Sequence, residues 1–137
     1  MAVSARSVAV PKIALPEVWP LVTHWIRRAM ERADLGSFDV VEADVFNDRA
    51  LLWLVYDGPK TLAAVVTKIV LTEKSRVCLI LAVGGEGAKD WTHLLSDAER
   101  YARAEGCDAI RLFGRRGWQR LLPDYSARNI VLEKRLL

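Results

Sequence analysis

A run of glycines at residues 84–87 is the stretch of this chain whose residue types best suit ligand chemistry. Gly84, Gly85 and Gly87 follow an apolar run and precede a segment with helical periodicity. In such a turn, free backbone amides and the positive end of the helix dipole favour an anion such as a phosphate. Glycine is equally suited to a plain strand-to-helix turn with unusual dihedral angles. The turn is therefore either an anion site or a purely structural turn.

One acidic side chain stands where a general base would be useful. Glu73 lies at the end of a predicted strand, from which a carboxylate can take a proton from an amine directly or through water. It is also an ordinary residue for a turn. His24 and His93 lie on separate predicted helices, so the sequence supports neither a metal site nor a Cys–His or Ser–His arrangement.

The last part of the chain is basic. Residues 100–137 carry nine basic and four acidic side chains, and the formal net charge of the whole chain is +3. A phosphate could be bound by three of these arginines, Arg115, Arg116 and Arg120. A solvent-exposed helix face produces the same excess of basic residues without any ligand. Because no exposed aromatics are interleaved with these arginines, the pattern argues against nucleic acid as a partner.

The residues around the glycines predict a strand, a helix and a second strand. The apolar run 77–83 is typical of a strand buried on both faces. From residue 88 to 105 apolar residues recur at spacings of three and four, which predicts a helix closed by Gly106. Residues 109–113 then favour a strand. This order indicates a right-handed parallel crossover.

The segment before the crossover predicts helices followed by antiparallel strands. The predicted elements are an edge strand at 7–13, a helix from 16 to about 36, a helix from 39 to about 48, and strands at 51–56 and 62–71. Asp39 and Glu42 resemble a capping box at the start of the second helix. Asp57-Gly58 predicts a hairpin turn, so these two strands and the strand at 77–83 form an antiparallel meander.

Two elements are predicted after the crossover. Residues 114–122 favour a short helix, and residues 129–136 alternate Ile130 and Leu132 against Val131 and Glu133, as a final strand does. We therefore expect residues 1–137 to form a single α/β domain with a mixed sheet of six or seven strands and helices on both faces.

Composition limits the class of protein. With 137 residues, 52% of them hydrophobic, the chain can bury a core without disulfides or metals. Its apolar runs are much shorter than the ~20 residues of a membrane span, and residues 1–10 contain no signal-peptide core. We expect a cytoplasmic protein with no membrane association. Cys78 and Cys107 lack metal-ligand spacing and are expected as reduced thiols.

The order of these elements resembles the GNAT acyltransferase superfamily over nearly the whole chain. The most specific parts are residues 94–107, which are similar to the superfamily's crossover helix with its closing glycine, and Asp124-Tyr125, where an aromatic after a short helix is usual. The chain also resembles small GNAT-like proteins of phages and prophages. The resemblance implies a sheet splayed at its centre, with acetyl-CoA in the gap and its pyrophosphate on the amides at the helix N-terminus.

The resemblance also implies roles for individual residues. The cofactor-binding residues would be Leu81, Ala82, Val83, Gly84, Gly85, Gly87 and Ala88. The tyrosine that often protonates the departing thiolate would fall near Arg120, which leaves Tyr125, or else Tyr101, as the proton donor. Glu73 is the candidate base, so Glu73 and Tyr125 form the predicted catalytic pair.

Several residues depart from the superfamily's loop pattern, Arg/Gln-x-x-Gly-x-Gly/Ala. Gly87 matches the first motif glycine, but Lys89 and Trp91 stand where small residues are expected, and Trp91 would block close approach. Glu86 and Asp90 place carboxylates near the amides that should hold the pyrophosphate. The sequence thus allows acetyl-CoA without requiring it, and it predicts weak affinity or none.

Two classes of function remain open. In the first, the resemblance implies a GNAT-fold protein with a degenerate acetyl-CoA site, either a divergent N-acyltransferase acting on a primary amine or a catalytically inactive descendant. Alternatively, it is a non-enzymatic binding module or a phage-related structural module on the same scaffold. The sequence identifies neither the amine nor a protein partner. Unpaired sheet edges at the two ends of the chain favour a homodimer.

Overall fold

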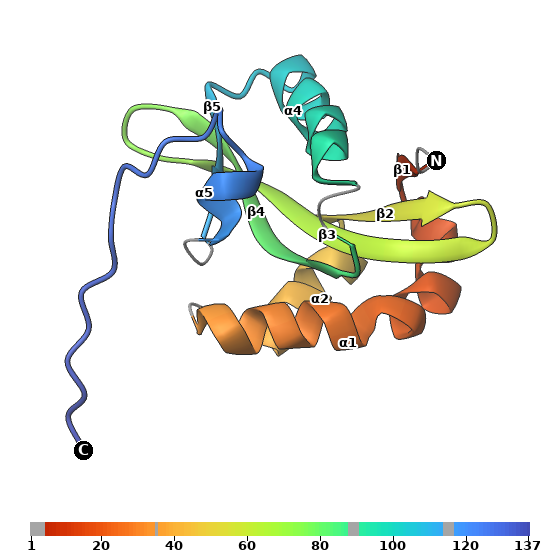
Figure 1. The fold of residues 1–137 in the computed structure, drawn as a ribbon, viewed down its shortest axis with the longest axis horizontal. Helices are drawn as coiled ribbons and strands as arrows, with labels where there is room; N and C mark the ends of the chain where they lie inside the picture. Colours follow the sequence, from red (N-terminus) through yellow and green to blue (C-terminus); the bar gives the residue numbers. More distant parts are fainter. Residues whose placement is uncertain (1–4, 35, 88–90, 114–116) are drawn as a thin grey trace.

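A computed structural model describes residues 5–34, 36–87, 91–113 and 117–137, which build one mixed sheet (Figure 1). The sheet has five strands in the order β1-β2-β3-β4-β5. They are β1 (Arg6–Ala9), β2 (Leu51–Asp57), β3 (Lys60–Leu71), β4 (Arg76–Gly85) and β5 (Ala109–Leu112). Neighbours from β1 to β4 are antiparallel, whereas β4 and β5 are parallel. The predicted meander and parallel crossover are confirmed.

Helices cover both faces of the sheet, as predicted. They are α1 (Leu15–Ala33), α2 (Phe38–Phe46), α4 (Leu95–Ala104) and α5 (Gly117–Leu121), with short 3-10 turns at Lys12–Ala14 and Thr92–Leu94. In Figure 1, α1 and α2 lie below the sheet and α4 lies above it. Trp118 and Leu121 of α5 pack against the same buried cluster as Leu95 and Ala98 of α4.

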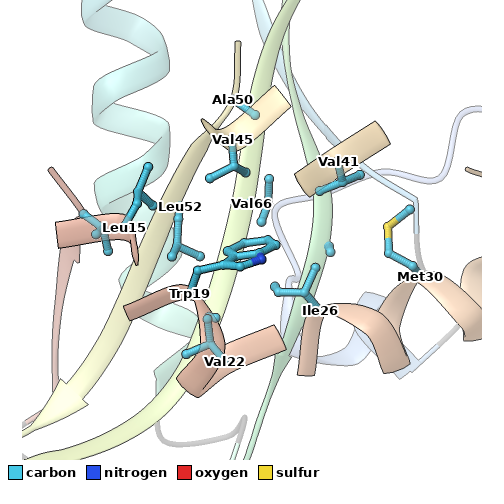
Figure 2. Close-up of a cluster of buried hydrophobic side chains, with 13 residues drawn as sticks. Leu15, Trp19, Val22, Ile26, Met30, Val41, Val45, Ala50, Leu52 and Val66 are labelled. Carbon is cyan, nitrogen blue, oxygen red and sulfur yellow. The ribbon is translucent and has the colours of Figure 1, made fainter. Parts of the chain in front are cut away.

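The core under α1 follows from the spacing of its apolar residues. The buried residues of this helix are Leu15, Trp19, Val22, Ile26 and Met30, which form one stripe at spacings of three and four. Figure 2 shows Trp19 beside Leu52 and Val66 of the sheet, with Val41 and Val45 of α2 in the same cluster. We call this group cluster 1.

The core under α4 is a separate group, which we call cluster 2. Leu95 and Ala98 of the helix pack with Trp53, Val55 and other residues of β2, β3 and β4. The apolar stripe predicted for the crossover helix is therefore confirmed. Within the part of the predicted helix 88–105 that the structure describes, α4 begins only at Leu95, because a 3-10 turn occupies residues 92–94.

A buried carboxylate fastens α2 to the sheet. Asp44, whose side chain is 8% exposed, accepts from Lys68 Nζ of β3 at 2.8 Å and from Arg49 Nε at 2.9 Å. Lys68 and Arg49 lower the pKa of this carboxyl. The predicted capping box is wrong: Ser37 is the N-cap residue of α2, with no side-chain cap, and Glu42 instead accepts from Trp19 Nε1 at 2.7 Å.

The prediction of six or seven strands is wrong. The described residues contain five, and residues 129–136, predicted as a final strand, form neither strand nor helix. Ile130 is 81% and Leu132 86% exposed, and Figure 1 shows this segment running away from the fold. Alternation suits a segment for pairing, but a strand forms only where a sheet edge receives it. The first edge strand is confirmed as β1, but it spans only Arg6–Ala9 instead of the predicted 7–13, because a 3-10 turn occupies Lys12–Ala14.

Candidate functional site

The stretch predicted to hold the cofactor begins at an irregularity in β4. Val66 pairs with Ala82 and Thr67 pairs with Ile80, so Leu81 is an extra residue, a β-bulge. Consequently Leu81 and Ala82 both face cluster 1, while Ile80 and Val83 belong to cluster 2.

Pairing between β4 and β5 stops directly before this bulge. The last paired residues are Ile80 and Leu112. Beyond them, among the residues that the structure describes, residues 82–85 pair with β3 on one side only, and Leu81 is the unpaired bulge residue. An open backbone edge of β4 therefore lies where the family resemblance implies acetyl-CoA.

The two glycines that end β4 have packing partners. A Cβ on Gly84 would lie 2.6 Å from the carbonyl oxygen of Trp25 and 2.8 Å from its Cβ, so α1 leaves no room for a side chain. A Cβ on Gly85 would collide with Leu62 O and Ala63 of β3, and φ of Gly85 is 156°. The packing of the protein itself therefore requires glycine at both positions, independently of any ligand.

The residues after these glycines are tied to the protein itself. The amide of Glu86 donates to Leu62 O at 2.9 Å, and the carbonyl of Glu86 accepts from Trp91 Nε1 at 2.7 Å. Trp91 is 1% exposed and belongs to cluster 2. Its indole thus packs in the core of the protein, and the predicted obstruction of a cofactor by Trp91 stays a prediction. Gly87 has φ of 65°, a conformation that favours glycine.

The beginning of α4 carries its own negative charge. Asp97 lies in the first turn of the helix, where a carboxylate offsets the positive end of the helix dipole. The Ser7 hydroxyl of β1 donates to its Oδ2, and Arg100 Nη1 donates to its Oδ1 at 3.1 Å. An anionic ligand at this end of α4 would therefore meet a carboxylate already in place.

Little space remains beneath the start of α4. The cavity there has a volume of about 10 Å³ and is lined by apolar side chains that include Trp53, Trp91 and Leu94, with Ser7 at its margin. That is room for about one water molecule. A larger, open hollow of about 440 Å³ lies between α1 and α2, where Trp19, Asp39, Glu42 and Phe46 line it.

The predicted catalytic residues are not brought together at the end of β4. Glu73 is exposed in the turn between β3 and β4, so residues 76–83 of β4, about 26 Å of strand, separate it from Gly84. Tyr125 follows α5 and donates its hydroxyl hydrogen to Glu99 Oε2 of α4 at 2.7 Å. Burial, together with this hydrogen bond, raises the pKa of the Tyr125 phenol.

Some predictions fall outside the described residues, and some site residues were not predicted. Ala88, Lys89, Asp90, Arg115 and Arg116 lie in the ranges that the structure does not describe. Ser7, Asp97 and Glu99 were missed. An acidic residue in a first turn is a readable signal for Asp97, but its contact with Ser7 spans ninety residues of sequence and has no local signal. Within the described ranges, no three His, Cys, Asp or Glu residues are grouped as metal ligands, and no helix is long and apolar enough to cross a membrane.

Comparison with known proteins places the fold. Neither a scan for protein families nor a search of curated proteins finds a match. A GNAT family acetyltransferase from Staphylococcus aureus is similar in structure, with a TM-score of 0.63 and 14% identity over 97% of this chain and 99% of that one. A predicted acetyltransferase from Clostridium acetobutylicum, solved with acetyl-CoA, gives 0.65 and 11% over 96% of each chain.

A third similar structure is an aminoglycoside acetyltransferase from an uncultured soil metagenomic sample. It has a TM-score of 0.66 and 7% identity over 97% of each chain. At these identities the likeness establishes the arrangement of the chain and not its activity. The protein has a GNAT-like fold, as the resemblance implied.

Proposed function

We propose that this chain is a GNAT-like protein with a degenerate acetyl-CoA site, and that it serves as a non-catalytic binding module. The observation that carries the proposal is the internal use of the groups that a pyrophosphate would need. The Glu86 amide is taken by Leu62, and the positive end of α4 is taken by Asp97. A pyrophosphate would have to break the hydrogen bond between the Glu86 amide and Leu62. It would also have to approach the negative charge of Asp97, and this repulsion opposes binding.

The positions of the candidate catalytic groups support the same proposal. Transfer to an amine needs a base within hydrogen-bond reach of the amine. Glu73 stands at the far end of β4, and the Tyr125 proton is directed at Glu99. A raised pKa further reduces the capacity of Tyr125 to give its proton to a thiolate.

Calorimetry with acetyl-CoA tests this proposal. We expect a Kd above 1 mM, which corresponds to a binding free energy of less than about 4 kcal/mol. Titration with acetyl-CoA up to millimolar concentration should then give no saturable heat. The variant Asp97→Asn, which removes the carboxylate charge while keeping a hydrogen-bonding side chain, serves as the comparison. Micromolar binding by the unaltered protein would overturn the proposal and restore the cofactor site.

A divergent N-acyltransferase acting on a primary amine is the second candidate. The open edge of β4 at residues 81–85 favours it, because a ligand with amide groups can add to an unpaired strand edge. One similar structure contains acetyl-CoA, and another is an aminoglycoside acetyltransferase solved with sisomicin. Mass spectrometry of an amine panel that includes sisomicin, incubated with acetyl-CoA and the protein, tests it through the appearance of acetylated product.

The biological setting is part of the same proposal. We place the protein in the cytoplasm, with an amine or a protein as its unidentified partner and with a phage-related role still a prediction. We further propose a homodimer, since the exposed edges of the sheet need cover. Sedimentation tests the dimer independently of acetyl-CoA.

A further inference from the structure

The open hollow between α1 and α2 combines aromatic walls with two carboxylates. It has a volume of about 440 Å³ and is lined by Trp19, Asp39, Glu42, Ala43 and Phe46. Ligand sites of this size are commonly walled by apolar and aromatic side chains, with a few polar groups that fix the orientation of the ligand. The hollow therefore has the composition of a binding site for a cationic group.

This hollow is separate from the open edge of β4. Trp25 is the residue of α1 against which Gly84 packs. Trp19 precedes Trp25 by six residues of the same helix, which is about 9 Å along its axis. The other residues that line the hollow belong to α2, and none of them is on β4. A ligand in the hollow thus uses none of the residues predicted to bind acetyl-CoA.

The aromatic side chains around the hollow are held by packing against one another. The Trp19 ring lies 6.0 Å from the Phe46 ring, edge to face, and 6.0 Å from the Phe38 ring in a stacked arrangement. Phe38 already carries a cation, because Arg27 Cζ lies 3.9 Å from its ring centroid. Guanidinium groups bind aromatic faces through cation–π attraction and stacking. The chain thus shows within itself that this aromatic group accepts a guanidinium.

The two carboxylates of the hollow supply negative charge that the fold does not balance with a cation. Asp39 and Glu42 are three residues apart on α2, so their side chains share one face of the helix. Trp19 Nε1 donates to Glu42 Oε2 at 2.7 Å, and the carboxylate can accept further hydrogen bonds. Asp44 and Asp48 form ion pairs with cations of this chain. In the part of the chain that the structure describes, Asp39 and Glu42 form none.

We propose that this hollow binds an arginine side chain of a partner protein. A planar guanidinium can lie against Phe46 and donate to the carboxylates of Asp39 and Glu42, a combination that the compact ammonium of lysine does not match. Val40, next to Asp39 on α2, is 57% exposed, so a peptide can also cover apolar surface beside the hollow, which a free amino acid cannot. The inference deepens the proposed role as a binding module and rests on it.

Titration of the full chain with leucyl-arginyl-leucine, capped at both ends, tests the site by NMR. The indole N–H signal of Trp19 should shift saturably, because a ligand paired with Glu42 changes the acceptor of that N–H. The same peptide with citrulline, a neutral analogue of arginine, should bind at least about tenfold more weakly, and the lysine peptide at least about threefold more weakly. Free L-arginine should also bind at least about threefold more weakly. Equal affinity for the citrulline or lysine peptide would refute the guanidinium, and equal affinity for free arginine would refute a peptide partner.

Two variants and a matched control locate the site. Glu42→Gln removes a charge but keeps an acceptor for Trp19 Nε1, and Asp39→Asn alters an exposed residue, so the second variant decides if the first fails to fold. Each should raise the Kd of the arginine peptide at least about fivefold. Glu31→Gln removes an exposed carboxylate of α1 outside the hollow and should leave the Kd within about twofold. An unchanged Kd in both hollow variants, or an equal loss in Glu31→Gln, would refute the site.

The results for the hollow and for acetyl-CoA can be told apart. Micromolar binding of acetyl-CoA would overturn the proposed function whether or not the arginine peptide binds. No shift of the Trp19 signal with the arginine peptide would overturn this inference alone and leave the absence of acetyl-CoA binding as it was. If that signal moves with protein concentration before any peptide is added, a second copy of this chain fills the hollow, and the partner proposed here is wrong.

Discussion

Replacing Gly84 with alanine tests whether the glycine turn is kept for packing. The added Cβ would lie 2.6, 2.8 and 2.9 Å from the carbonyl oxygen, the Cβ and the carbonyl carbon of Trp25. Two of these atoms are backbone of α1, which cannot move aside as a flexible side chain would. Ordinary contacts between carbon atoms are 3.5–4.0 Å, so α1 must shift by about an ångström relative to β4.

The expected cost follows from this shift. Overpacking of a tight interior contact costs about 1–3 kcal/mol, and α1 contributes five of the thirteen buried residues of cluster 1, more than any other helix or strand. For a chain of this length such a loss lowers the melting temperature by about 3–12 °C. Thermal unfolding followed by circular dichroism measures it, with urea unfolding as a second estimate of the free energy.

A matched glycine elsewhere supplies the control. A Cβ on Gly117, at the start of α5, would meet nothing within 4 Å, so Gly117→Ala should leave the melting temperature unchanged or slightly raised. If Gly84→Ala melts like the unaltered protein, then packing against α1 does not require this glycine. The structural explanation of the turn would be wrong, and the anion site would become the better interpretation.

Three further predictions concern buried polar groups. Trp91→Phe keeps an aromatic side chain but removes both the donor to the Glu86 carbonyl and part of the buried ring system, so the free energy of unfolding should fall by at least about 1–2 kcal/mol; a loss below about 0.3 kcal/mol in urea unfolding would refute the role of that bond. The pKa of the Asp44 carboxyl is lowered in the folded protein, so its stabilising effect is present above the unfolded pKa near 4 and is lost as pH falls through the folded value. Asp44→Asn should therefore reduce the fall in the free energy of unfolding as the pH is lowered into the acidic range. An unchanged pH dependence would count against the ion pairs with Lys68 and Arg49. Burial raises the pKa of the Cys78 thiol to about 11, so iodoacetamide at pH 8 should alkylate only the other cysteine in the folded protein, as peptide mass spectrometry would report.

Local pattern in the sequence was sufficient for most elements of this fold and for their order, but it also predicted a strand at residues 129–136 that the structure does not form. The stripe from Leu15 to Met30 and the apolar run in β4 are periodicities, and periodicity follows from the geometry of helix and strand alone. The crossover from β4 to β5 was predictable for the same reason, since a strand, a helix and a strand of these lengths connect in parallel. The GNAT-like arrangement was readable from that order.

Tertiary structure decided what the candidate site can do. The sequence shows that Gly84 is a glycine, but only the approach of α1 to β4 explains why. It also shows Trp91 at the start of a helix, and the packing of cluster 2 turned that indole inward. The contact between Ser7 and Asp97 and the bulge at Leu81 depend on partners distant in sequence. The pattern of residues along a chain indicates which secondary structure each segment is suited to form. The free energy of a contact depends instead on which surface the fold brings against that segment. For this reason residues 129–136, which have the pattern of a strand, do not pair with the sheet.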